Sequence, residues 1–175
     1  MYRELNRPLL QVEVILSDFL LRGSLTPLGE LLNFLNDRRR GAFTFAACEL
    51  LPLSPERQLK GVKQDTLTVN RNQLVTLALL DEAQAAAERL LKASRSVVFY
   101  TAQFAIQGEL HVNVDARDND LMEDSRDFYP VSQATLYPLR PIAPSITRQL
   151  PLLMLQRSQV QAYHLRRQAT IQSRS

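Results

Sequence analysis

The sequence predicts a mainly β protein with short helices, built as two tandem small β-barrel-like repeats. Residues 12–25 alternate apolar and polar side chains with a period of two, as strands do. The same pattern returns in residues 97–110. Four positions match at one constant offset, namely Phe19 with Phe104, Leu21 with Ile106, Gly23 with Gly108 and Leu25 with Leu110. Such self-similarity at a fixed spacing indicates one structural unit present twice.

The repeat extends through most of the chain. Residues 50–53 correspond to 136–139, and residues 67–74 correspond to 153–160, at an offset of 86 positions. We therefore expect a first β-barrel repeat over residues 11–80, a linker helix over 81–95, a second β-barrel repeat over 96–167 and a flexible tail over 168–175. The two copies differ most in the middle, where a leucine-rich helix in the first is replaced by an acidic stretch in the second.

The first unit begins with a predicted hairpin of residues 12–16 and 19–25. Ser17 and Asp18 form its turn, because both side chains can bond nearby backbone amides. Gly23 lies inside the second strand, where glycine normally weakens a sheet. Its recurrence as Gly108 predicts a sharp bend or a close backbone approach in both units.

The remaining elements of the first unit follow in order. Leucines at helical spacing predict a short helix over 28–35. A third strand is expected over 43–51, an exposed connection over 54–65, and a last hairpin with strands 67–69 and 74–77. Residues 81–92 are rich in Ala, Glu, Leu and Lys, which favour a helix that joins the two units.

Composition limits the function classes. The net charge is +3 and neither repeat is strongly basic, so charge alone does not indicate a nucleic-acid ligand. Cys48 is the single cysteine, which excludes an intrachain disulfide and is compatible with a reducing compartment. It aligns with Ala134, which predicts a small buried side chain. No apolar signal core or membrane-spanning run is present, so we expect a cytoplasmic protein with no membrane partner.

Two basic segments are candidates for binding an anion or nucleic acid. The loop of Arg38, Arg39 and Arg40 offers guanidinium groups that suit phosphate. The turn of Asn70, Arg71 and Asn72 adds a further arginine, which recurs as Arg157. The alternative is structural: a run of arginines at a loop tip is often plain surface, and Arg71 and Arg157 can pack their stems over the sheet and bond within the unit.

Residues 115–127 are acidic, and carboxylates are the ligands that hard cations prefer. The glycine and the ligand spacing of a calcium loop are missing, which favours a solvated surface loop. His111 and His164 lie in the second unit without counterparts in the first. Because no nucleophile motif, phosphate loop or zinc-ligand pair occurs, we expect no metal site, no cofactor and no enzyme activity.

The order of the hairpin, its bend glycine, the third strand and the final hairpin resembles the Sm-like group of small five-stranded barrels. That resemblance implies RNA-binding residues near Asn36 and Asp37 and at Asn70, Arg71 and Asn72. The chain departs from the group by the helical segment between its second and third strands and by lacking the Arg-Gly pair in the last hairpin. The duplication is also similar to a bacterial family of uncharacterised function, a likeness that implies no activity.

Two functional hypotheses follow. The first is a non-catalytic interaction or assembly module whose partner is another protein or a further copy of the chain. Five-stranded units leave edge strands that pairing between repeats or between chains would cover. The second is nucleic-acid or nucleotide binding through residues 38–40 and 70–72.

Overall fold

A computed structural model describes residues 8–123 and 125–166. Its helices and strands, in chain order, are β1 (Leu10–Leu16), β2 (Phe19–Leu25), α1 (Leu31–Asn36), β3 (Ala42–Pro52), β4 (Val62–Asn70), the 3-10 turn η1 (Arg71–Gln73), β5 (Leu74–Leu79), α2 (Glu82–Ala87), β6 (Ala93–Tyr100), β7 (Phe104–Val112), β8 (Phe128–Pro138), β9 (Gln149–Gln156), the 3-10 turn η2 (Arg157–Gln159) and β10 (Ala162–Leu165). The prediction of a mainly β protein with short helices is confirmed.

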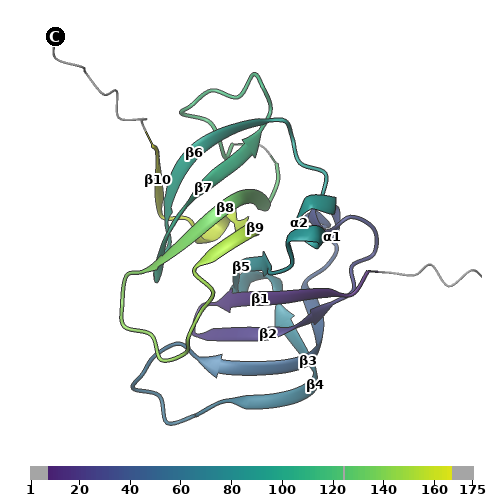
Figure 1. The fold of residues 1–175 in the computed structure, drawn as a ribbon, viewed down its shortest axis with the longest axis vertical. Coiled ribbons are helices and arrows are strands. Elements are labelled where there is room, and N and C mark those ends of the chain that lie inside the picture. The colour runs from purple at the N-terminus through teal and green to yellow at the C-terminus, as the bar shows by residue number, and fades with distance from the viewer. Residues whose placement is uncertain (1–7, 124, 167–175) are drawn as a thin grey trace, which may run out of the picture.

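The strands form one open, antiparallel sheet in the order β10-β6-β7-β8-β9-β5-β1-β2-β3-β4 (Figure 1). Two tandem β-barrel-like repeats were expected, and the structure instead has a single open sheet. The physical reason is the pairing of β5 with β9, which places Leu77 opposite Met154 and joins the first five strands to the last five. We call β1–β5 the first half and β6–β10 the second half.

The two halves share details of backbone geometry. Ala47 in β3 and Gln133 in β8 both have a φ of 49°, although neither is glycine. At each of these positions the neighbouring strand shifts its register, between Arg22 and Ser24 in β2 and between Gln107 and Glu109 in β7. The irregularity therefore occurs at the same place in the strand order of each half.

The predicted close approach at the two strand glycines is confirmed. A Cβ atom on Gly23 would lie 2.9 Å from the carbonyl oxygen of Ala46. A Cβ atom on Gly108 would lie 2.9 Å from the carbonyl oxygen of Ser132 and 2.5 Å from a methyl group of Val131. Glycine is required at both positions because the adjoining backbone occupies the space of a side chain.

Two apolar cores lie on opposite faces of the sheet junction, and each takes residues from both halves. The first-half core includes Phe128, Leu152 and Met154 from the second half. The second-half core includes Ile15 and Val75 from the first. All six residues of β5 are buried, as expected for a strand covered on both faces. The junction is therefore part of the hydrophobic core.

Several element bounds differ from the sequence prediction. Strand β4 begins at Val62, within the expected exposed connection, because residues 62–70 pair along β3 despite their polar side chains. Helix α2 ends at Ala87, short of the predicted residue 92, and β6 starts at Ala93. Within residues 8–123 and 125–166, neither helix is long and apolar enough to cross a membrane. The expected flexible tail, 168–175, lies outside the described residues.

Candidate functional site

The structure brings the two predicted basic segments together at one end of the β3–β4 hairpin. Ala42 pairs with Asn70 in the strand register, which places the loop before β3 beside the turn after β4. The backbone N–H of Arg71 donates to the carbonyl of Gly41 at 3.0 Å. Residues 38–40 and 70–72 are therefore neighbours, as a shared anion site would need.

The arginines of this region are already paired with carboxylates. Asp127 accepts from Arg38 at 3.1 Å and from Arg71 at 2.9 Å. The Oδ1 atom of Asp37 lies 2.9 Å from the Nε of Arg39, and its Oδ2 atom lies 3.6 Å from the Nε of Arg40. We call these six residues the arginine–aspartate cluster. Sequence reasoning missed Asp127 as a partner because it lies far along the chain, at the end of the acidic stretch.

Arg71 is the most buried member of the cluster, with 8% of its surface exposed. Its guanidinium carbon lies 5.1 Å from the ring centroid of Phe128 and 5.7 Å from that of Phe43. Arg40 lies over Phe34 at 4.5 Å. These contacts support the structural interpretation of Arg71, because a cation over an aromatic face is stabilised where water is excluded.

The pairing has a direct electrostatic effect on both carboxyls. Burial alone would raise the pKa of Asp127, but hydrogen bonds from Arg38 and Arg71 outweigh it and lower that pKa. Hydrogen bonds from Arg39 lower the pKa of Asp37. Both groups are therefore ionised at neutral pH and offset much of the positive charge that a phosphate ligand would need.

Asn36, which the resemblance placed near an RNA-binding loop, is engaged inside the protein. Its Oδ1 accepts from the backbone N–H groups of Asp127 and Phe128, each at 2.9 Å. Its Nδ2 donates to the carbonyl of Phe128 at 3.1 Å. The side chain thus binds the start of β8 and holds α1 against the second half.

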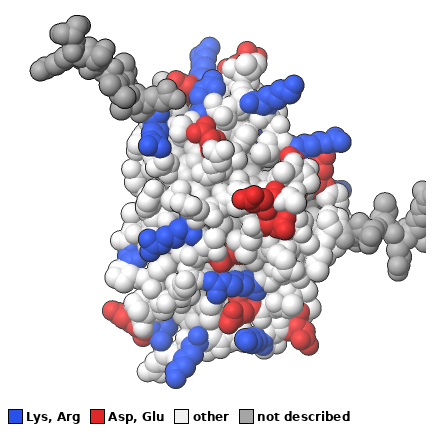
Figure 2. Space-filling model, viewed as in Figure 1, with Lys and Arg blue, Asp and Glu red and all other residues white. Residues whose placement is uncertain are grey.

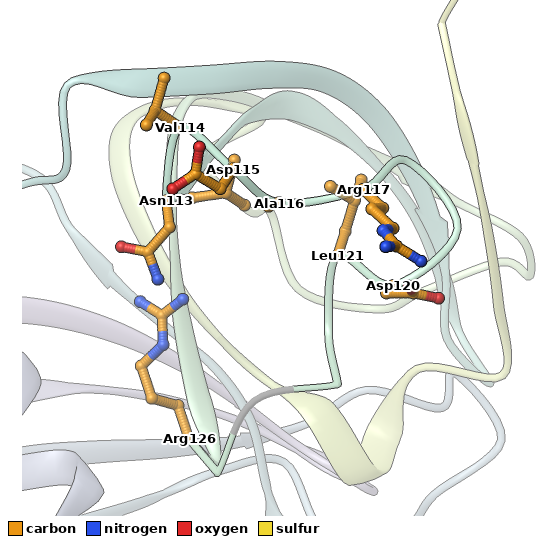
Figure 3. Close-up of a pocket in the computed structure, with 9 residues that line it drawn as sticks. Asn113, Val114, Asp115, Ala116, Arg117, Asp120, Leu121 and Arg126 are labelled. Carbon is orange, nitrogen blue, oxygen red and sulfur yellow. The ribbon is translucent and has the colours of Figure 1, made fainter.

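The acidic stretch borders a surface hollow between β7 and β8 (Figure 3). Asn113 and Arg126 point toward each other across it, and Arg117 lies close to Asp120. Asp118 bonds Arg95 at 3.3 Å. The part of the chain that the structure describes has no group of three or more His, Cys, Asp or Glu side chains that could hold a metal ion.

The remaining reactive side chains, those of Cys48, His111 and His164, lie on three different strands, β3, β7 and β10. Cys48 is buried as expected, and burial raises the pKa of its thiol. His111 contacts the hydroxyl of Ser132 at 2.7 Å, on β7 and β8. His164 lies on β10 and contacts the hydroxyl of Tyr100 at 3.1 Å.

The two edge strands of the sheet are a further candidate surface for binding. No sequence motif marks them. Among the described residues, β4 pairs only with β3 and β10 pairs only with β6. Most of β4 is exposed, including Thr66 and Thr68. Each edge strand presents backbone N–H and C=O groups on its outer side, which can pair with a further strand.

No family model, curated protein or solved structure matches this chain. The face of the molecule seen in Figure 2 shows acidic and basic side chains interspersed, without a broad region of one sign. Over the described residues, the fold and its surface thus define a mainly β protein with β4 and β10 as its sheet edges and an internally paired arginine cluster.

Proposed function

We propose that the chain is a non-catalytic assembly module that associates with protein strands at its free sheet edges. The observation that supports this proposal best is the ten-stranded sheet itself, in which β4 and β10 are the two edge strands. Strand addition uses main-chain hydrogen bonds for affinity and alternate side chains for specificity. It needs no reactive side chain, which fits the dispersed histidines and buried cysteine.

The two halves support an interpretation as copies of one five-stranded unit similar to the Sm-like group. Each half has the same strand order, β5-β1-β2-β3-β4 and β10-β6-β7-β8-β9. In each, a bulge residue with positive φ and a crowded glycine occupy matching places. The contact of β5 with β9 is then an association between two such units, achieved within a single chain.

Edge strands of soluble proteins are commonly protected by charged residues, proline or short length. β4 is nine residues long, with Lys63 and Asp65 confined to its first part. From Thr66 to Asn70 it has no charged residue. A stretch of this kind is a suitable strand-pairing surface.

Light scattering coupled to size-exclusion chromatography of the full chain tests the proposal. We expect a mass above that of one chain at micromolar concentration. The variant Thr66→Lys/Thr68→Lys places two charges on the edge and is expected to yield monomers. Thr44→Lys is the matched control, since Thr44 is exposed on β3, one strand further in, and contacts Thr68 at 3.0 Å. A wild-type chain that remains monomeric contradicts the proposal.

Nucleic-acid binding through residues 38–40 and 70–72 is the second candidate. The side chain of Arg39 is 90% exposed and its one paired carboxylate, Asp37, is two residues away. Phosphate could replace that partner, and binding would then weaken with added salt. Anisotropy at low salt with single-stranded RNA and DNA tests this. Binding that is absent, or unchanged in Arg39→Ala relative to the control Arg89→Ala, counts against it.

A further inference from the structure

We infer that copies of this chain associate head to tail, with β10 of one copy adding to β4 of the next. This inference rests on the proposed assembly function and specifies its partner and geometry. The chain already contains one such contact, because β5, the last strand of the first half, pairs with β9, the fourth strand of the second. Strands β10 and β4 hold the same two places in their halves, and among the described residues they are the two edges without a second partner strand.

The two halves correspond residue by residue as well as in the order of their strands. The turns η1 and η2 follow β4 and β9 and start at Arg71 and Arg157, which are 86 positions apart. The φ values of 49° at Ala47 and Gln133 occur at the same offset. The backbone N–H of Arg71 bonds the carbonyl of Gly41, and that of Arg157 bonds the carbonyl of Asp127, again at this offset. Residues 66–69 of β4 therefore correspond to 152–155 of β9.

The internal junction supplies the register of the contact between copies. In it, Thr76 pairs with Leu155, Leu77 with Met154, Ala78 with Leu153 and Leu79 with Leu152. Shifted by 86 positions, the same antiparallel register pairs Ala162 with Val69, Tyr163 with Thr68, His164 with Leu67 and Leu165 with Thr66 of the next copy. This four-residue match spans the whole of β10.

The side chains at these positions suit a reversible contact. Leu152 and Met154 of β9 are buried in the first-half core. Their counterparts in β4 are Thr66 and Thr68, which favour strands but bury less apolar surface. The charged Lys63 and Asp65 fall outside the paired stretch. We therefore expect association between copies to be weaker than the internal junction and to depend on concentration.

The loop between β7 and β8 occupies a place that fits a second contact. At the internal junction, α1 lies between β2 and β3 in the chain and contacts β8 across the junction through Asn36. In the second half the corresponding connection includes Asp118 and Asn119, which lie beside β10 around a surface hollow. This loop would meet the start of β3 in the next copy.

The contact uses different surfaces on its two sides, so it is heterologous. A pair of copies joined in this way keeps one free β4, on one copy, and one free β10, on the other. Such contacts generate rings if the rotation between copies closes and helical filaments if it does not.

Disulfide trapping tests the direction and the register. In a Cys48→Ala background, one chain has Thr66→Cys and a second has Leu165→Cys. Alanine is compatible at position 48, since Ala134 occupies the matching place in β8. Mixing the two under mild oxidation is expected to produce a linked dimer on a non-reducing gel, while each chain alone gives none. Asp65→Cys mixed with Leu165→Cys is the out-of-register control, in which the band is lost.

The outcomes separate this inference from the assembly function. If the wild-type oligomers dissociate in the Thr66→Lys/Thr68→Lys variant but the cysteine variants give no linked dimer, the assembly function stands. The head-to-tail arrangement is then overturned. A linked dimer from Thr66→Cys alone indicates β4 pairing with β4 and also overturns it. Absence of any wild-type oligomer at micromolar concentration overturns both.

Discussion

Arg71 in the first half donates to Asp127 in the second half across 2.9 Å. The side chain of Arg71 is 10% exposed and that of Asp127 is 24% exposed, so the bond lies largely out of water. It closes the end of the β5–β9 junction at which Asn36 binds the start of β8. Arg38 and Arg71, which the sequence offered as parts of an anion site, thus connect the two halves through Asp127.

Asp127→Asn is expected to destabilise the chain. The substitution leaves the buried Arg71 charge without its carboxylate, and the partial exposure of Asp127 moderates the cost to about 1–3 kcal/mol. Urea unfolding followed by circular dichroism measures this loss. The control is Asp118→Asn, which removes an exposed partner of Arg95 and is expected to change the unfolding free energy by less than about 1 kcal/mol. Equal effects of the two substitutions would show that the Arg71–Asp127 pair adds no more stability than the exposed Arg95–Asp118 pair.

The same bond predicts a pH dependence of stability. The pKa of Asp127 is lowered from its ordinary value of 3.8 by its two arginines, in spite of the opposing effect of burial. Its folded pKa is below the unfolded one, so its contribution is fully present above about pH 4 and is lost as pH falls through the folded pKa. Unfolding free energies measured between about pH 6 and about pH 2.5 should therefore fall less steeply in Asp127→Asn than in the wild type. Parallel pH profiles would contradict this.

Substituting either crowded glycine is expected to weaken the sheet. In Gly108→Ala the new methyl group would lie 2.5 Å from Val131 and 2.9 Å from the Ser132 carbonyl, so strands β7 and β8 must separate. Overpacking of this kind typically costs about 1–3 kcal/mol. In Gly23→Ala the added Cβ would have only one contact shorter than 3.0 Å. This substitution should therefore lower the free energy of unfolding by less than Gly108→Ala does. Thermal unfolding of the two variants gives the comparison.

Gly41→Ala is the matched control for these glycines. No atom lies within 4 Å of its added Cβ, and its backbone conformation is accessible to other residues. We expect a change in unfolding free energy within about 0.5 kcal/mol. A loss similar to that of Gly108→Ala would show that crowding is not the cause.

Local features of the fold were accessible from the sequence. The period-two pattern of residues 12–25 predicted β1 and β2, and the recurrence of Gly23 as Gly108 predicted two close backbone approaches. The alignment of Cys48 with Ala134 predicted a small buried side chain in each half. Strand periodicity is a local pattern, so it can be read from the sequence. The atoms that crowd the two glycines lie on the adjacent strands β3 and β8, and it was the recurrence of glycine inside a strand that predicted the close approaches.

The candidate site was only partly predictable. The sequence named Arg38–Arg40 and Asn70–Asn72 as candidate binding residues, and the structure places the two segments side by side. The role of Asp127 was not accessible, because its partners are 89 and 56 positions away along the chain. Whether these arginines bind an anion stays a prediction that the anisotropy titration tests.

The sequence by itself predicted the first hairpin, the close backbone approaches at two glycines and the correspondence between segments 86 positions apart, since each can be read from local or recurring patterns of side chains. Only the tertiary structure decided how the segments combine. Pairing of β5 with β9 turns the expected pair of barrels into one open sheet, and it leaves β4 and β10 as the edges. The physical reason is that backbone groups at a strand edge pair with little regard to sequence, so the choice of partner depends on the packing of both cores around the junction.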